Sequence, residues 1–210
     1  MKLVRNKQRK GFTLIEVLVV IAILSALGAI AWVAYGAIES RKQNNTTQQH
    51  VDMLATCLTD YFSNAKAQDP ILWADGGTEG SVALYKMLSG DFDCDGKMDK
   101  GRTAYCKELV HYEIGDSTKR EGIPFSSIGK NQYAIVDAWG RPISYRLGYG
   151  KHGTKNTKAG KSTKNKVKET EQGTGINADF DIYSLGEDGL GDGRTNKGEN
   201  EDNISNIKFL

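Results

Sequence analysis

The sequence is short of proline: three occur in 210 residues, and none precedes Pro70. Charge is missing from one long stretch, because Glu16 is the only charged residue between Leu14 and Ile38. These 25 residues exceed the ~20 apolar residues that span a bilayer as a helix, and no proline is present to break that helix. We therefore predict a single transmembrane helix over residues 12–38.

Cysteine is scarce as well. Three cysteines are too few for a disulfide-dense scaffold, and their spacing does not fit a zinc site. Cys94 and Cys106 lie in one turn-rich segment that we place in an oxidising compartment, where disulfides persist. They are therefore a candidate disulfide, with Cys57 left free, and two unpaired thiols remain the alternative.

The three histidines predict no catalytic centre. The local patterns put them on a polar helix, a strand and a lysine-rich insert, and none has a nucleophile or metal-ligand spacing around it: His50, His111 and His152. We expect a structural protein rather than an enzyme, with no catalytic residues.

The net charge of +2 conceals an uneven distribution. Five of the 28 basic residues precede the apolar run, which leaves 23 against 26 acidic residues in the rest of the chain. This balance excludes a uniformly basic surface of the nucleic-acid-binding type, so we expect no nucleic-acid partner. Basic residues before a span stay in the cytoplasm. The chain is thus predicted to cross the inner membrane once, with residues 39–210 in the periplasm.

Glu16 needs an explanation, because a carboxylate in lipid is costly and is expected to have a partner. The run could be a secretory signal peptide, cleaved after small residues such as those at 29–31, or an uncleaved anchor. A third hypothesis is a cut between Gly11 and Phe12, which creates an α-amino group. That cation on a neighbouring copy would neutralise Glu16 and fix the register of stacked subunits.

The segment Gly11-Phe12-Thr13-Leu14-Ile15-Glu16, behind a basic leader and ahead of a long apolar helix, resembles the class III signal of type IV pilins and type II secretion pseudopilins. The resemblance implies that residues 1–11 are a leader removed by a prepilin peptidase. It also implies N-methylation of Phe12 and a salt bridge from Glu16 to the amino end of an adjacent subunit.

Beyond the apolar run, Val51, Leu54, Leu58, Phe62 and Ala65 recur at three- and four-residue intervals, which is a helical stripe. Residues 39–69 should therefore continue the helix as a stalk that packs on a domain. A helix over residues 12–67, stopped by the Asp-Pro pair that follows, would be ~84 Å long. The pilin family often has a proline within this helix, whereas this chain has only Gly28 and Gly36 as weak points.

Residues 78–90 predict a short helix closed by Gly90. Gln132–Asp137 and Pro142–Leu147 alternate polar and apolar residues around a tight turn, and Phe180–Leu185 supplies a third strand. The segment DAWGRPISYR resembles part of the major pseudopilin. The expected fold is α+β and pilin-like, with a long helix packed on a small antiparallel sheet.

A lysine-rich insert over residues 148–175 contains one aliphatic residue larger than alanine, Val167. Such a segment cannot bury enough apolar area to order itself. A solvated loop is therefore favoured, and a basic patch for nucleic acid is the alternative.

The acidic stretch over residues 185–205 resembles the calcium loop of major pseudopilins. The resemblance implies that the carbonyl of Leu185 and the carboxylates of Asp188 and Asp202 hold the ion, with Asp192 as the alternative to Asp202. Oxygen donors on a flexible loop suit Ca²⁺. A plain acidic surface loop remains the other explanation.

A second calcium candidate has acids at loop positions one, three, five and nine and a glycine at six: Asp91, Asp93, Asp95 and Asp99. The spacing is similar to the first half of an EF-hand loop. Position twelve, however, is Arg102, where a glutamate is required. A solvated turn is therefore the competing hypothesis.

Together these features predict a structural subunit, the major pseudopilin of a type II secretion system. Its expected partners are copies of itself, minor pseudopilins, the prepilin peptidase and an inner-membrane assembly platform, with structural calcium as the cofactor. The alternative is a type IV pilin or minor pseudopilin involved in adhesion or DNA uptake. Pilins of that class commonly end in a disulfide-bounded loop, whereas this chain has no cysteine after Cys106.

Overall fold

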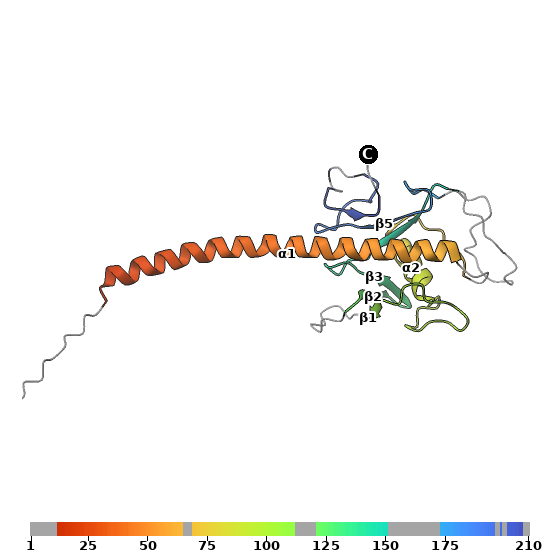
Figure 1. Cartoon of the computed structure of the whole chain (residues 1–210), viewed down its shortest axis with the longest axis horizontal. Coiled ribbons are helices and arrows are strands. Elements are labelled where there is room, and N and C mark those ends of the chain that lie inside the picture. Colours follow the sequence, from red (N-terminus) through yellow and green to blue (C-terminus); the bar gives the residue numbers. More distant parts are fainter. Residues whose placement is uncertain are drawn as a thin grey trace, which may run out of the picture. The chain divides into compact units, whose positions relative to one another are not determined.

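The computed structural model describes residues 12–64, 69–111, 121–150, 173–195, 198 and 201–207. The chain divides into two compact units, the first ending at Lys42 and the second beginning at Gln43. Helix α1 (Leu14–Asn64) is continuous across that boundary (Figure 1), so the predicted single long helix is confirmed. The leader over residues 1–11 and most of the lysine-rich insert lie outside the described residues.

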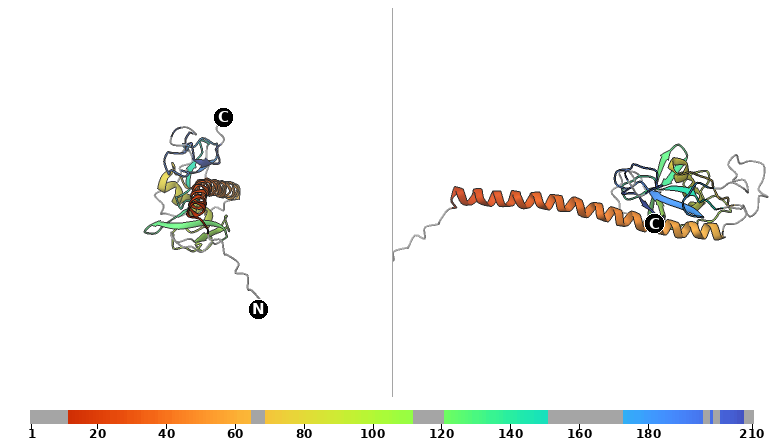
Figure 2. Two further views of the ribbon diagram at one scale, coloured as in Figure 1. Left: turned by 90° about the vertical axis from the view of Figure 1, so that its left-hand side faces the viewer. Right: turned by 90° about the horizontal axis from the view of Figure 1, so that it is seen from above.

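The second half of α1 supplies one side of the core of the second unit. Its buried side chains recur every three or four residues and are at most 1% exposed: Thr47, Val51, Leu54, Leu58 and Tyr61. Both sheets lie on the same flank of this part of the helix (Figure 2). The predicted stripe is correct for Val51, Leu54 and Leu58, since burial follows the 3.6-residue period of the helix. Tyr61 is buried in place of the predicted Phe62, which is half-buried, and Ala65 lies outside the described residues.

Helix α2 (Gly77–Ser89) matches the predicted short helix. It ends at Gly90, which has a left-handed φ of 74° and donates its N–H to the Lys86 carbonyl at 3.0 Å. Close packing also depends on a glycine, since a Cβ on Gly80 would lie 2.1 Å from the Tyr145 carbonyl oxygen. Only glycine lets α2 approach the neighbouring strand this closely.

The first sheet contains β1 (Leu109–His111), β2 (Ile123–Gly129) and β3 (Gln132–Ile135), in that order. β2 and β3 are antiparallel, whereas β1 and β2 are parallel. The sheet lies beside the second half of α1 in Figure 1. The strand that the sequence predicted around His111 is β1, whereas β2 was not predicted.

The second sheet contains β4 (Ser144–Leu147), β5 (Phe180–Ser184) and β6 (Ile204–Ser205), all antiparallel. β5 is the predicted third strand. Together with α1 the two sheets confirm the α+β fold class, with the parallel β1–β2 pair as an addition.

The predicted pairing of the strands around the AWGRP turn is correct only next to the turn. The tight turn is present: Val136 and Pro142 form an antiparallel bridge, and the Ile143 N–H donates to the Ile135 carbonyl at 2.8 Å. The pairing stops there, because β3 and β4 belong to different sheets. β3 pairs with β2 instead, through a turn in which Asn131 has a φ of 54°. Asparagine tolerates that left-handed conformation better than most residues, and this permits the tight connection.

Candidate functional site

The first unit exposes its apolar side chains. The large hydrophobic residues described in the segment Phe12–Ile38 are between 48% and 87% exposed, with Phe12 at the upper limit. By length and composition, α1 is the one helix among the described residues that could cross a membrane. A continuous apolar surface of this extent is unstable in water, so lipid or another polypeptide must cover it.

Glu16 has a local partner at the start of α1. Its Oε2 accepts hydrogen bonds from the Thr13 N–H at 2.7 Å and the Thr13 hydroxyl at 2.8 Å. The Glu16 N–H in turn donates to the Thr13 hydroxyl oxygen at 3.3 Å. This reciprocal pattern is a capping box, and Thr-x-x-Glu is its sequence signature, which was not predicted. The acid is thus hydrogen-bonded within one copy, so its presence near lipid does not by itself require a second copy.

The predicted processing site is only partly described. Gly11 lies outside the described residues, and Phe12 lies two residues before the start of α1 with its side chain 87% exposed. An exposed position before a helix is accessible to an enzyme, but the cleavage and methylation themselves stay predictions.

The carboxy-terminal turn brings the predicted calcium ligands Asp188 and Asp202 together. The Asp202 Oδ2 accepts the Asp188 N–H at 2.9 Å, and the Leu185 carbonyl accepts the Gly189 N–H at 3.2 Å. Gly186 has a φ of 63°, and a Cβ there would lie 2.2 Å from the Asp202 carbonyl oxygen. A glycine at this position therefore allows oxygen atoms of two distant segments to converge.

Asp192 is directed to other partners. Its Oδ1 accepts the Arg194 N–H at 2.9 Å, and its carbonyl accepts a hydrogen bond from the buried Arg146 at 2.8 Å. Arg146 also forms an ion pair with Asp75 at 3.1 Å. Between the two alternatives, Asp202 rather than Asp192 therefore lies next to Asp188.

The acidic turn, Asp91–Asp99, gathers three of its four predicted ligands. Asp91, Asp93 and Asp99 each offer one carboxylate oxygen, and these oxygens lie within 4.8 Å of one another. Asp95 does not join them, because its Oδ1 accepts the Lys97 N–H at 2.8 Å. Partial desolvation, a hydrogen bond with Asp91 and the charges of Asp95 and Asp99 raise the pKa of Asp93. A cation would relieve this crowding of charge.

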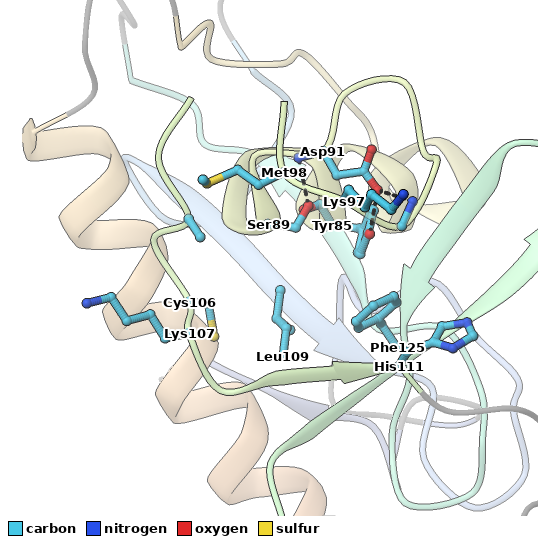
Figure 3. A pocket seen from close by; sticks show the side chains of 12 residues that line it. Tyr85, Ser89, Asp91, Lys97, Met98, Cys106, Lys107, Leu109, His111 and Phe125 are labelled. Carbon is cyan, nitrogen blue, oxygen red and sulfur yellow. Dashed lines mark hydrogen bonds between the residues drawn. The ribbon is translucent and has the colours of Figure 1, made fainter. Parts of the chain in front are cut away.

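Asp91 is the anchor of the acidic turn. It is 1% exposed and accepts hydrogen bonds from the Tyr85 hydroxyl at 2.7 Å and the Gly96 N–H at 2.9 Å. A cavity of about 300 Å³ opens beside these residues and reaches His111 and Phe125 of the first sheet (Figure 3). Arg102, at loop position twelve, instead forms an ion pair with Asp69 at 3.1 Å. The turn therefore lacks the last ligand of an EF-hand.

The carboxy-terminal turn and the acidic turn both offer oxygen ligands, which suit calcium. Ca²⁺ takes six to eight oxygens, so carboxylates alone are insufficient and backbone carbonyls and water must complete either set. The residues that would hold the ion are Leu185, Asp188 and Asp202 in the carboxy-terminal turn, and Asp91, Asp93 and Asp99 in the acidic turn. Neither set contains the thiolate or imidazole ligands that zinc prefers.

The predicted bridge between Cys94 and Cys106 is not formed. All three cysteines are free thiols, and the sulfur that lies near Cys106 belongs to Cys57 on α1. The prediction relied on sequence proximity, whereas the fold brings the segment before β1 against the long helix.

Asp137 is an important polar residue that was not predicted from the sequence. It is 2% exposed, and its Oδ1 accepts the N–H groups of Trp139 and Arg141 at 2.9 and 2.8 Å. Its Oδ2 accepts the Ser184 hydroxyl at 2.6 Å, and Ser184 Oγ in turn accepts the Gly186 N–H at 3.1 Å. Asp137 thus connects the turn between the sheets to the carboxy-terminal turn. The Asp-x-x-Gly pattern was the available signal.

Comparison with known proteins adds independent findings. A family profile described as the prokaryotic N-terminal methylation motif matches residues 6–32, which include Gly11, Phe12 and Glu16. The chain is 30% identical to the type IV major pilin protein PilE of Neisseria gonorrhoeae over 96 residues, 46% of this chain and 54% of that protein. It is also 30% identical to the type IV major fimbrial protein FimA of Dichelobacter nodosus over 111 residues, 51% of this chain and 69% of that protein.

A fimbrial protein of Neisseria meningitidis is 31% identical over 87 residues, 41% of this chain and 48% of that protein. The chain therefore spans about half to two thirds of the length of these curated relatives. No solved structure matches it.

Proposed function

The chain belongs to the type IV pilin family, and from this membership we propose that it works as a filament subunit. Within the family we propose the role of major pseudopilin of a type II secretion system. The subunit would be held in the inner membrane by one pass, with the second unit in the periplasm. Polymerisation would then drive protein export across the outer membrane.

The exposed apolar segment Phe12–Ile38 carries the filament proposal. The second unit has a core of its own, whereas the large hydrophobic side chains described in this segment are 48% exposed or more. Lipid can cover them before assembly, and equivalent helices of other copies can cover them afterwards. The main partner is therefore the chain itself. Prepilin peptidase, minor pseudopilins and an inner-membrane assembly platform are proposed as the further partners.

The carboxy-terminal part supports the pseudopilin over a pilin. The sequence has no cysteine after Cys106, so a disulfide cannot tie that part of this chain. The hydrogen bonds of Asp137 with Ser184, of Arg146 with Asp192, and between Asp188 and Asp202 hold it instead. A turn held by carboxylates fits the calcium-type loop implied by the resemblance to major pseudopilins.

Three variants test whether Glu16 acts in assembly through its charge. Glu16→Leu removes both the charge and the cap, whereas Glu16→Gln removes the charge and keeps a side chain that serves in a capping box. Thr13→Ala weakens the cap and keeps the charge. We expect both Glu16 variants to lose filaments by more than tenfold in sheared fractions and electron micrographs, while Thr13→Ala retains them. Normal filaments from Glu16→Gln would show that the acid is only a helix cap.

Deletion of the gene in its host separates export from adhesion. A pseudopilin mutant should accumulate folded exported proteins in the periplasm, and the full-length gene should restore their release. A version lacking residues 151–168 tests the alternative of DNA uptake. Loss of DNA retention with export intact would favour the pilin role over the pseudopilin role.

We propose structural calcium as the cofactor. An ion that binds only the folded loop stabilises the fold by about 2.7 kcal/mol at a hundredfold excess over its dissociation constant. The carbonyl of Leu185 and the carboxylates of Asp188 and Asp202 would hold it in the carboxy-terminal turn, since Asp192 is engaged with arginine side chains.

Thermal unfolding of the full chain in detergent, with calcium or with a chelator, tests this proposal. Asp188→Asn should remove the part of the stabilisation by calcium that comes from the carboxy-terminal turn, and Asp192→Asn is the matched control that should keep it. Asp91→Asn reports on the acidic turn in the same way. An unfolding midpoint that does not respond to calcium would exclude the cofactor.

A further inference from the structure

A cluster of two thiols and a carboxylate lies outside the proposed assembly and calcium sites. Cys57 is on the second half of α1, Cys106 lies in the segment before β1, and Glu108 follows it. One ligand atom from each lies within 4.8 Å of the others. Cys106 is 2% exposed, Cys57 is half-buried and Glu108 is exposed. All three residues belong to the second unit.

Packing fixes the two cysteines near each other. The N–H groups of Tyr105 and Cys106 both donate to the Leu88 carbonyl, at 2.9 and 3.1 Å. The Tyr105 ring meets the Tyr61 ring edge-on at 4.9 Å, and Tyr61 lies one helical turn beyond Cys57. Figure 3 shows Cys106 beside the ribbon of α1. The segment is thus held against the helix, with the two sulfur atoms within 4.8 Å of each other.

The two thiols are not equivalent. A hydrogen bond from the Cys106 thiol lowers the pKa of Cys57, and the same interaction raises the pKa of Cys106. The Cys106 thiol also lies 3.7 Å from Glu108 Oε2, to which it can donate. Cys57 is also the more exposed of the two, so it is the thiol that an oxidant reaches first, and its thiolate is the reactive form.

We propose that Cys57 and Cys106 form a disulfide in the mature protein and so tie the second half of α1 to the segment before β1. The proposed periplasmic location of the second unit supplies the oxidant, a thiol–disulfide exchange protein. In this respect the inference rests on the proposed function.

The exchange proceeds in two steps. The Cys57 thiol loses its proton to solvent, and the thiolate attacks the disulfide of the oxidant, forms a mixed disulfide and releases one thiolate of the oxidant. The Cys106 thiol then passes its proton to Glu108, and its sulfur attacks the Cys57 sulfur, which breaks the mixed disulfide and releases the second thiolate. The oxidant has gained two electrons and becomes a dithiol by taking up two protons, one from solvent and one from Glu108.

A zinc site is the competing use of the same side chains. Structural zinc takes four ligands, and only three potential ligands gather among the described residues. A disulfide needs only the two sulfur atoms. Cys94 takes no part, because its sulfur is not in the cluster.

Non-reducing peptide mapping of the full-length chain tests the pairing. Cells that produce the chain are quenched with acid, free thiols are alkylated, and the protein is purified in detergent and digested. We expect the Cys57 peptide to be joined to the Cys106 peptide, with Cys94 alkylated. Reduction should lower the thermal midpoint by about 5–15 °C, as expected for a bridge that closes a loop of this length.

Matched variants make the result specific. Cys94→Ser should leave the bridge and the midpoint shift unchanged, whereas Cys57→Ser should remove both. Glu108→Gln should slow bridge formation with oxidised glutathione without changing the final pairing, because it removes the proton acceptor.

Three results would overturn the proposal. A Cys94–Cys106 peptide would show that the wrong pair was assigned. Three alkylated thiols in the purified chain after exposure to oxidised glutathione would show that the pair cannot close. Stoichiometric zinc that is lost in Cys57→Ser would assign the cluster to metal binding.

A separate experiment tests the proposed periplasmic location: protease added to spheroplasts should cleave the second unit. If the protease does not reach it, the proposed location fails. The oxidised-glutathione experiment on the purified chain still decides the pairing.

Discussion

Leu24 and Leu54 lie on the same helix, yet Leu24 is 62% exposed and Leu54 is fully buried. Both residues favour the helix equally, so the difference comes from what faces them. Leu54 packs into a core supplied by α2 and both sheets, whereas Leu24 has only its own helix in a single copy. The second unit is therefore stabilised by its own residues, and the first unit depends on lipid or on other copies. Substitutions that affect one unit and not the other test this division.

The largest effect is expected from Arg146→Ala in the second unit. Arg146 is 1% exposed and lies between the carboxylates of Asp75, at 3.1 Å, and Asp181, at 4.0 Å. Removal of one partner from a buried ionic cluster costs about 3–5 kcal/mol. Urea unfolding in detergent should show this loss, while membrane insertion stays normal. Arg194→Ala is the control: Arg194 also pairs with Asp75 but is 46% exposed, so the cost should stay below about 1 kcal/mol.

A charge placed in the first unit should impair membrane insertion and leave the folding stability of the second unit unchanged. Leu24→Lys puts an ammonium group within the apolar segment, at an insertion cost of about 2.5–3.5 kcal/mol. We expect less protein in carbonate-washed membranes and an unchanged urea midpoint for the second unit. Leu24→Ile should behave as the parent. Equal loss of folding stability in the lysine variant would contradict the division into two units.

Two glycine-to-alanine substitutions, one in each unit, should change stability in opposite directions. Gly80→Ala places a methyl group against the Tyr145 backbone and should destabilise the second unit by about 1–3 kcal/mol. A Cβ on Gly28 would meet no atom within 4 Å, so Gly28→Ala should favour the helix by about 0.5–1 kcal/mol. Urea unfolding measures the first effect and circular dichroism measures the second. Similar losses from both would show that α1 is packed at Gly28 in the monomer.

The smallest effect concerns Asp93 in the acidic turn. Its raised pKa means that the folded chain binds this proton more tightly than the unfolded chain does. Without calcium, stability should therefore fall as pH rises from the ordinary value of 3.8 through the raised pKa. Asp93→Asn should remove that fall and be slightly more stable than the parent at neutral pH. Thermal midpoints across pH in a chelator measure this, and calcium should reverse the order. Identical pH profiles would show that the carboxylates do not interact.

The sequence was most informative about the helices. The uninterrupted apolar run and the three- and four-residue stripe predicted α1, and Gly90 marked the end of α2. Strand pairing was not predictable in the same way, because alternation identifies a strand without naming its partner. β2 contains Pro124 and two adjacent serines and so has no clear alternation. Because β2 was omitted, the pairing next to the turn was extended to β3 and β4, whereas β3 pairs with β2.

The candidate ligands also show that the sequence predicts contacts between neighbouring residues better than contacts between distant segments. Asp91, Asp93 and Asp99 converge because they lie within one short turn, which spacing alone could indicate. The choice between Asp202 and Asp192 depended on the close approach at Gly186 and on the bond from Arg146, both contacts between distant segments. The neighbour of Cys106 was missed for that reason: Cys57 is 49 positions away in sequence.

The capping box at the start of α1 has a consequence for energetics. In the single copy the Glu16 carboxylate already holds the Thr13 N–H and hydroxyl. An incoming amine would therefore replace or share these bonds, so the net electrostatic gain per added subunit is smaller than a new ion pair would suggest. In the proposed filament, the driving force for growth would then come from covering the apolar surface. The role proposed for the acid would be to select one axial offset among many with nearly equal hydrophobic contact.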